Sequence, residues 1–268
     1  EDQLEELHDH VLEIADQDVK YWKPRNDRML DSQRFWELGT RYAEMDEDKD
    51  APEHIELNDG YLAVDKLTSM VAGAHWSFDV PPKDTGYEDT AQDIEDMLRW
   101  ADEKLNKKSI ASMHGTLTRD EVHNAVLRGW ITGMILPNPK DKFLPWTYVL
   151  EDPLFVYPRY SGDDLIRVTH RYTISVLEAT STFDRAFEFL LDKEEEDEVE
   201  VTDYYDSVYR LTLLNESGEF MDTDGSKKHV DRVVLQPLVR HGYIDISGEP
   251  INPWIIVTPR GSPTRKFA

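Results

Sequence analysis

Carboxylates are the most abundant reactive side chains in this sequence, and two stretches space them as calcium-binding loops do. The stretch DEDKDAPEHIEL, which begins at Asp46, has the alternating acidic opening of an EF-hand loop. However, Ala51 stands where that loop needs glycine, and Leu57 stands where it needs a bidentate glutamate. The stretch DTDG at 222–225 is similarly incomplete. We therefore predict solvated turns and no calcium site at either place.

The other reactive side chains form no recognised catalytic or metal-binding pattern. Cysteine is absent, which excludes disulfides and thiolate chemistry. His8 and His10 form a close pair, but an i, i+2 spacing on a helix turns two side chains about 200° apart. The acidic neighbours Glu95 and Asp96 fall on a predicted exposed helix face. Phosphate-binding loops, nucleophile elbows and zinc-protease motifs do not occur, so we expect no catalytic, cofactor-binding or metal-binding residue and no enzyme.

The charge balance restricts the partners of the chain. Aspartate and glutamate number 55 against 30 lysines and arginines, a formal net charge of −25. Such a chain repels a phosphate backbone, and the sequence pattern shows a basic cluster only near the end, at Arg260, Arg265 and Lys266. Three interpretations of the acidity stay open: a well-solvated surface, adaptation to molar salt, where the Debye length is about 3 Å, or a surface past which DNA slides without sticking.

Length and hydropathy indicate a globular protein of one large domain or two small ones. The 39% hydrophobic content is sufficient for a core. No apolar stretch approaches the roughly 18 to 20 residues that cross a bilayer, and the N-terminus lacks the basic start of a signal peptide. We expect a soluble intracellular or particle-associated protein that does not bind membranes. The sequon Asn215-Glu216-Ser217 is interpreted as a chance match.

The first half of the sequence has the periodicity of helices. Apolar residues three or four positions apart predict helices over about 1–20, 28–45, 60–71, 89–107 and 118–130. Asn58 or Asp59 is expected to cap the third helix, and a capping box from Thr118 to Glu121 the last. The helix over 89–107 is expected to bury five residues: Ile94, Met97, Leu98, Ala101 and Leu105. HWSFDVPP at 75–82 alternates like a short strand.

From about residue 137 the period changes to that of strands. In LIRVTHRYTISV the two-residue alternation predicts a half-buried strand, with Val168 and His170 on one face and Arg167 and Thr169 on the other. Further strands are predicted at VEVTDYY, SVYRLTLL, VDRVVLQPLV and PWIIVTP, with loops at NESGE and DTDGSKK and a short helix in STFDRAFEFLLDK capped by Ser181 or Thr182. Helices followed by strands indicate an α+β fold, with a helical part at 1–136 and a β-rich part at 137–268.

The stretch WTYVLEDPLFVYPR, residues 146–159, places Asp152-Pro153 between two apolar runs. Pro145 and Pro158 flank them, and since proline lacks a backbone donor, these positions favour edges and turns. The stretch therefore predicts a strand, a corner and a second strand. Tryptophans within the apolar patterns are expected in the core or in subunit contacts: Trp76, Trp100, Trp130, Trp146 and Trp254.

The order of these pieces resembles the portal protein of tailed double-stranded DNA viruses. The matching stretches are ELNDGYLAVDKLTSMVAGAHWSFDVPP, MLRWADEKLNKKSIASMHGTLTRDEVHNAVLRGWITGMI, WTYVLEDPLFVYPR and LVRHGYIDISGEPINPWIIVTPRG. The resemblance spans about residues 20–262 and implies the wing region, in which helices pack against an antiparallel sheet. It implies that Asp152-Pro153 is the turn after the wing helices and that GEPINPWIIV leads toward the stem. The stem, clip and crown are not present, so we expect a portion of a longer polypeptide.

The resemblance also implies a function and partners. A portal is a homo-oligomeric ring of about twelve subunits at one capsid vertex, the channel for genome packaging and ejection. Its expected partners are the major capsid protein, a head-tail adaptor, the terminase during packaging, and double-stranded DNA that passes without sequence-specific binding. The expected location is the virion, and the host cytoplasm during assembly. Because acidity is spread along the whole chain, we favour a virus of halophilic archaea.

Two alternatives to a portal subunit stay open. One is a metal-dependent hydrolase of a halophile, which would need several of the scattered Asp, Glu and His side chains to converge in one pocket. The other is a non-portal virion or adaptor protein, which differs from a portal subunit in its subunit count.

Overall fold

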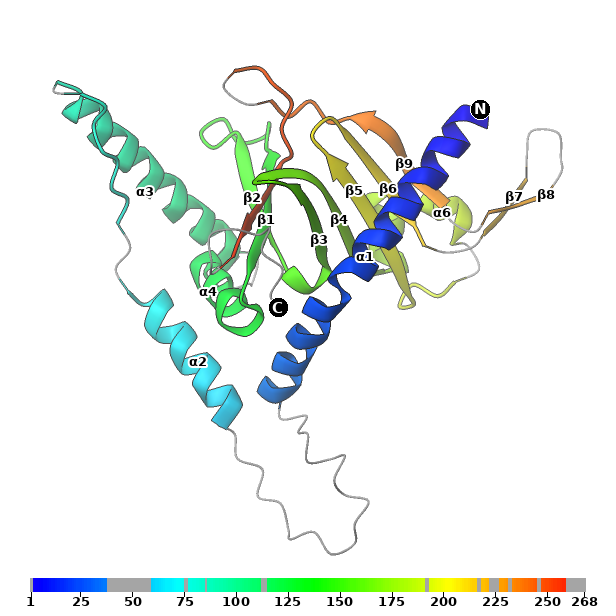
Figure 1. Ribbon diagram of the computed structural model, residues 1–268, viewed down its shortest axis with the longest axis horizontal. Coiled ribbons are helices and arrows are strands. Elements are labelled where there is room, and N and C mark those ends of the chain that lie inside the picture. Colours follow the sequence, from blue (N-terminus) through cyan, green and yellow to red (C-terminus); the bar gives the residue numbers. More distant parts are fainter. Residues whose placement is uncertain are drawn as a thin grey trace, which may run out of the picture. The chain divides into compact units, whose positions relative to one another are not determined.

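The computed structural model describes residues 2–37, 59–74, 77–84, 86–111, 115–190, 193–215, 218–221, 227–230, 233–244 and 247–258 (Figure 1). The chain forms two compact units. Unit 1 contains the described residues up to Pro24 and from Phe155 to Trp254, and unit 2 contains those from Arg25 to Leu154 and from Ile255 onward. Helices come first along the chain and antiparallel strands later, which confirms the predicted α+β class. None of the described helices is long and apolar enough to cross a membrane.

Helix α1 (Asp2–Trp36) is continuous, although the sequence predicted two helices with a break between them. Pro24 lies inside it, where proline removes one hydrogen bond and disfavours the helix. Tertiary hydrogen bonds flank the proline and compensate for this loss: Trp22 Nε1 donates to the Pro158 carbonyl at 2.6 Å, and Arg25 Nη2 to the Pro153 carbonyl at 3.0 Å. The rest of the predicted second helix, from residue 38, lies outside the described residues.

Three further helices belong to unit 2: α2 (Asp59–Ala72), α3 (Glu88–Ala111) and α4 (Leu117–Arg128). Helix α4 is capped by Thr116, whose side chain accepts from the Arg119 amide at 3.3 Å. The predicted capping box was wrong because Thr118 already lies inside the first turn, where its amide and hydroxyl donate to Asn106. Helix α4 ends at Gly129, whose φ of 74° is the left-handed geometry that glycine favours.

The predicted strand at 75–82 is also wrong for its described part, since residues 77–82 have no regular structure. A side chain takes the place of a partner strand there. The Val80 amide donates to Glu95 Oε1 of α3 at 2.9 Å. Proline at 81 and 82 supplies no further donor, so this segment lacks the ladder of hydrogen bonds that a strand requires.

A small sheet follows the helices of unit 2, with the strand order β10-β1-β2. Its strands are β10 (Trp254–Val257), β1 (Ile131–Pro137) and β2 (Trp146–Glu151), and β1 begins before the predicted change of period. Residue 133 of β1 must be glycine because the ring of Tyr148 lies very close to its backbone. A Cβ atom at that position would lie 2.5 Å from the ring of Tyr148 on β2, so the tyrosine occupies the space that any side chain would need.

Unit 1 is built on a five-stranded antiparallel sheet in the order β3-β4-β5-β6-β9. The strands are β3 (Val156–Ser161), β4 (Asp164–Ser175), β5 (Glu198–Asp206), β6 (Tyr209–Leu214) and β9 (Val233–Arg240). Strands β7 (Gly218–Met221) and β8 (Lys227–Val230) form a separate hairpin where the sequence predicted loops. Their residues GEFM and KKHV lack the long alternation that identified the other strands.

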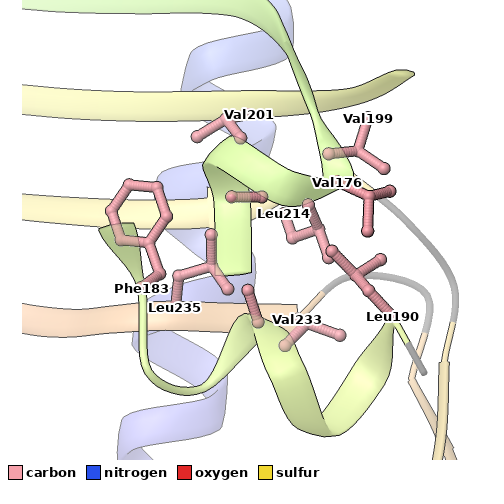
Figure 2. Close-up of a cluster of buried hydrophobic side chains, with 10 residues drawn as sticks. Val176, Phe183, Leu190, Val199, Val201, Leu214, Val233 and Leu235 are labelled. Carbon is pink, nitrogen blue, oxygen red and sulfur yellow. The ribbon is translucent and has the colours of Figure 1, made fainter. Parts of the chain in front are cut away.

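The main core of unit 1 lies under two short helices, α5 (Val176–Thr182) and α6 (Ala186–Phe189) (Figure 2). Their apolar side chains pack on the sheet together with Phe183, Leu190, Val199, Val201, Leu214, Val233 and Leu235. Ser175 caps α5 by accepting from the Glu178 amide at 3.2 Å. The predicted cap at Ser181 or Thr182 was wrong because both residues lie at the end of α5, and the helix inside the predicted stretch, α6, begins after Arg185.

The N-terminal part of α1 packs on the sheet of unit 1 through a buried ionic cluster. Asp18 is fully buried and accepts from Arg159 Nε at 2.7 Å and from Arg167 Nε and Nη2 at 2.8 and 2.9 Å. Its hydrogen bonds raise the pKa of Arg167 above the ordinary arginine value. Arg171 Nη2 donates to Asp16 at 2.7 Å. The polar face of β4 therefore meets α1, and the centre of β4 is covered on both faces instead of half-buried.

An aromatic cluster in unit 1 surrounds a buried histidine of β4. His170 stacks on Tyr172 with ring centres 4.5 Å apart and meets Trp254 edge-on at 5.3 Å. Burial lowers the pKa of His170 to about 3, since the site disfavours the charged imidazolium. The alternation of β4 correctly placed His170 among inward residues, and the structure explains its role as a packed neutral ring.

The buried ionic cluster makes a strong prediction for stability. Replacement Asp18→Asn is expected to lower the free energy of unfolding of unit 1 by about 3 kcal/mol, because Arg159 and Arg167 lose the carboxylate that compensates their partial burial. Urea denaturation would measure the loss. Asp9→Asn, at an exposed position of the same helix, removes the same charge and should change the stability little. Equal effects of the two substitutions would contradict a stabilising role for the cluster.

The buried histidine predicts a specific dependence on pH. The unfolded chain binds a proton at His170 below a pH of about 6.5, whereas the folded protein does so only near 3, so protonation favours unfolding as the pH falls. As the pH falls from about 6.5 toward 3, the free energy of unfolding of the native protein should decrease by roughly 1.4 kcal/mol per pH unit more than that of a His170→Phe variant. Urea midpoints of both proteins at pH 7 and pH 5 test this, and parallel pH dependences would refute it.

Candidate functional site

The Asp152-Pro153 corner is held by a hydrogen-bond network within unit 2. Arg128 Nε and Nη2 donate to the two carboxylate oxygens of Asp152 at 3.0 and 2.7 Å, a bidentate pair. Asp152 Oδ1 also accepts from the Leu154 amide at 2.9 Å, which shapes the 3₁₀ turn η2 (Pro153–Phe155). The predicted strand, corner and strand are thus confirmed. Both charges of the pair are engaged with each other, so the corner has a structural role.

A second network joins the corner to the middle of α1. Arg25 Nη2 donates to the Pro153 carbonyl at 3.0 Å, and Asn26 Nδ2 donates to the Leu154 carbonyl at 2.7 Å. The guanidinium of Arg25 lies over the ring of Trp130, 4.8 Å from its centre. Because the corner carbonyls are satisfied by side chains, its backbone is fixed without a neighbouring strand.

One small pocket of unit 2 lies between the end of α1, α2 and α4. Trp36 stacks on Tyr61 with ring centres 5.8 Å apart and meets His123 edge-on at 5.2 Å. Arg119 donates to Asp65 at 2.7 Å, and the pocket has a volume of about 260 Å³. Burial lowers the pKa of His123. The charged side chains pair with each other, and no nucleophile lies against a base, so the pocket supports no particular reaction.

The residues that the sequence singled out for possible chemistry do not gather. Among the described residues, no group of three or more His, Asp or Glu side chains is placed to hold a metal ion. Glu95, one of the two acidic neighbours on α3, accepts a hydrogen bond from the Val80 amide, which is a structural contact with the backbone. Asn215 of the sequon donates its side-chain amide to Thr202 Oγ1 at 2.8 Å. The acidic stretches from Asp46 and at 222–225, and the basic residues from Arg260 onward, lie outside the described residues.

The most distinctive surface of unit 2 is apolar and lies on α2 and α3. Large hydrophobic side chains of these helices are exposed: Tyr61, Leu62, Leu67, Met70, Val71, Ile94, Met97, Trp100 and Ile110. Met70 is 65% exposed and Met97 is 58% exposed. We call these nine residues the α2/α3 apolar surface. Helix α4 packs against both α2 and α3 but leaves these side chains uncovered.

This surface contradicts the predicted burial of α3. The spacing of its apolar residues predicted that Ile94 and Met97 face a core, yet both are exposed, whereas Ala101 is buried and Leu98 and Leu105 are half-buried. Trp130 and Trp254 are buried as predicted, and Trp146 is half-buried. Trp100 is not part of the core, and Trp76 lies outside the described residues. Helical spacing identifies an apolar stripe but does not say whether the same chain covers it.

Sequence reasoning also missed a gathering of lysines in unit 2. The β1–β2 loop carries Lys140 and Lys142, and the C-terminal half of α3 carries Lys104 and Lys108, which act electrostatically on Asp141 of that loop. The two segments are separated in the sequence, so the local run Lys104, Lys107 and Lys108 gives no indication that the loop lysines lie beside it. Pairing of β1 with β2 brings the loop into place.

The corner network predicts that arginine geometry, and not charge alone, stabilises unit 2. Arg128→Lys keeps the charge but loses the bidentate pair with Asp152 and the bond to the Met29 carbonyl, so stability should fall by about 1 to 2 kcal/mol. Arg99→Lys makes the same change in an exposed pair with Asp96 and should be nearly neutral. Urea denaturation compares the two variants, and an unaffected Arg128→Lys protein would exclude a stabilising corner network.

Comparisons with known proteins do not assign this chain. No protein-family model matches its sequence, and no curated protein is significantly similar to it. A function must therefore be argued from its surfaces.

Proposed function

We propose that this chain is the wing region of a portal-type ring subunit of a tailed double-stranded DNA virus. The ring would sit at one capsid vertex, form the channel for genome packaging and ejection, and provide the docking site for the terminase and for tail or adaptor proteins. The observation that carries the proposal is the α2/α3 apolar surface, which is patterned for burial but is left exposed by the part of the chain that the structure describes. The sequence resemblance supplies the identity of the assembly.

Uncovered apolar side chains favour an assembly over a monomeric enzyme. Large contiguous apolar patches are uncommon on monomeric soluble proteins and mark interaction sites. In a ring, each subunit offers two different surfaces to its two neighbours, since the contacts are heterologous. Helices α2 and α3 are separate elements that each contact α4 and each expose apolar side chains, so both provide apolar contact area. This arrangement suits a subunit with two neighbours.

The charge of the chain supports the proposed channel function. With a net charge of −25, the surface would let DNA pass without strong binding, because phosphates are repelled. The same acidity suits a protein of a halophilic host, where salt screens the repulsion between carboxylates. The hydrogen-bonded Asp152-Pro153 corner has a structural role within unit 2, as expected of a structural subunit.

The two alternatives have less support. A metal-dependent hydrolase would need converging ligands, and the described residues offer no group of three. A non-portal virion or adaptor protein could use the same apolar surface, so only the subunit count separates it from a portal. No described feature favours it over a ring of about twelve subunits.

The proposal predicts a ring whose assembly depends on α2 and α3. Electron microscopy of the natural protein in molar salt should show rings of about twelve subunits around an open channel. The double variant Met70→Glu, Met97→Glu should remain folded by circular dichroism but sediment as smaller species, because charges would be buried in the subunit contacts.

The control for this experiment is Leu177→Glu combined with Ile244→Glu. These residues are similarly exposed but lie in unit 1, so the variant should still form rings. Monomers or two-fold dimers of the native protein would refute the portal proposal. Native rings that survive the α2/α3 substitutions would show that the apolar surface is not a subunit contact.

A further inference from the structure

Five exposed lysines gather in unit 2 although the chain as a whole is strongly acidic. Three belong to the C-terminal half of α3 and two to the β1–β2 loop: Lys104, Lys107, Lys108, Lys140 and Lys142. Lys108 Nζ donates to Thr147 Oγ1 of β2 at 3.0 Å, which places this end of α3 beside the β1–β2 hairpin. We call these five residues the lysine patch.

The loop that carries two of these lysines has a defined conformation. Asp141 Oδ1 accepts from the amides of Phe143 and Leu144 at 3.0 and 3.1 Å, and the Asn138 amide donates to the Pro145 carbonyl at 2.7 Å. Leu144 is buried and anchors the loop. The two amides, together with the charges of Lys104 and Lys108, lower the pKa of Asp141. The lysines are thus presented by a fixed turn whose own carboxylate is already engaged.

Aromatic side chains lie next to the lysines. Phe143 is 82% exposed, the highest value among the exposed large hydrophobic residues of the described chain. It borders an open hollow of about 430 Å³ that is also lined by Asn138, Lys140, Asp141 and Lys142. On α3, the Lys104 ammonium lies 5.6 Å from the ring centre of Trp100, which is itself exposed. Lysines that alternate with exposed rings match the way proteins bind single strands, through phosphates and stacked bases.

The net charge of the chain does not prevent such binding. At 0.15 M salt the Debye length is about 8 Å, so carboxylates farther away contribute little to the potential at the patch. The ion pair between Lys107 and Glu103, at 3.5 Å, is exposed and therefore weak. The five lysines outnumber Asp141 and Glu103, the carboxylates that act on them, and so can still attract a phosphate.

We propose that the lysine patch and Phe143 bind single-stranded nucleic acid, with the lysines on phosphates and the Phe143 ring stacked on a base. This site goes beyond the proposed channel, which would let duplex DNA pass without binding it. An acidic protein partner would satisfy the lysines but leaves the exposed phenylalanine unexplained. Failure of this proposal would leave the ring proposal standing, because neither the five lysines nor Phe143 belongs to the α2/α3 apolar surface.

The test is a fluorescence anisotropy titration of a labelled oligothymidine with the native protein between about 0.05 and 0.2 M salt, with folding checked by circular dichroism at each salt concentration. The affinity should fall with salt, by about −0.7 in log–log slope per phosphate contact. The triple variant Lys104→Gln, Lys140→Gln, Lys142→Gln should reduce the slope by about 2 and weaken binding at least tenfold. The matched control, Lys20→Gln, Lys66→Gln, Lys83→Gln, removes the same charge from other exposed positions and should bind as the native protein does.

Phe143→Ala separates base stacking from charge. It should weaken binding of the single strand about tenfold and leave the salt slope of that binding unchanged, because the lysine contacts to phosphates remain. Equal affinity of the patch variant and its control would overturn the proposal. So would lysine-dependent binding to anionic lipid vesicles without binding to the oligonucleotide, or a change in subunit count caused by the patch variant, since either result assigns the surface to another partner.

Discussion

The buried carboxylate of Asp18 is the interaction on which unit 1 most depends. It accepts three hydrogen bonds from Arg159 and Arg167, which belong to neighbouring strands, and so ties α1 to the sheet at a defined register. A charge with no exposed surface is tolerated only when it is paired and fully bonded. Apolar contacts of Val11 with Tyr204, Leu211 and Leu213 continue the same interface. One helix face is thus held by charge at one point and by packing beside it.

Unit 2 uses a comparable arginine–carboxylate pair for a different purpose. Arg128 fixes Asp152 beside the 3₁₀ turn η2, where side chains satisfy the corner carbonyls. Polar interactions hold the corner, while large apolar side chains of α2 and α3 stay exposed among the described residues.

The sequence predicted the fold class and most elements because periodicity reports local structure. The alternation through Ile166, Val168 and His170 identified β4, and helical spacing identified α2, α3 and α4. Periodicity failed where residues far apart in the chain determine the local structure. Trp22 and Arg25 stabilise α1 across Pro24 through bonds to residues far along the chain, and the exposure of Met97 depends on what other elements cover. The lysine patch also joins separate segments, so no local pattern reveals it. Caps were misplaced because threonine and serine are frequent near helix starts.

The two prolines at the margins of the five-stranded sheet have a consequence for how copies of the protein meet. Pro158 lies in β3 and Pro237 in β9, the two outermost strands, and the register of β9 against β6 is also irregular. An outer strand without a full row of amide donors is a poor template for a strand from another molecule. Crowded copies are therefore discouraged from merging their sheets into fibres. Association is directed to side-chain surfaces, where it can be specific, reversible and limited in number.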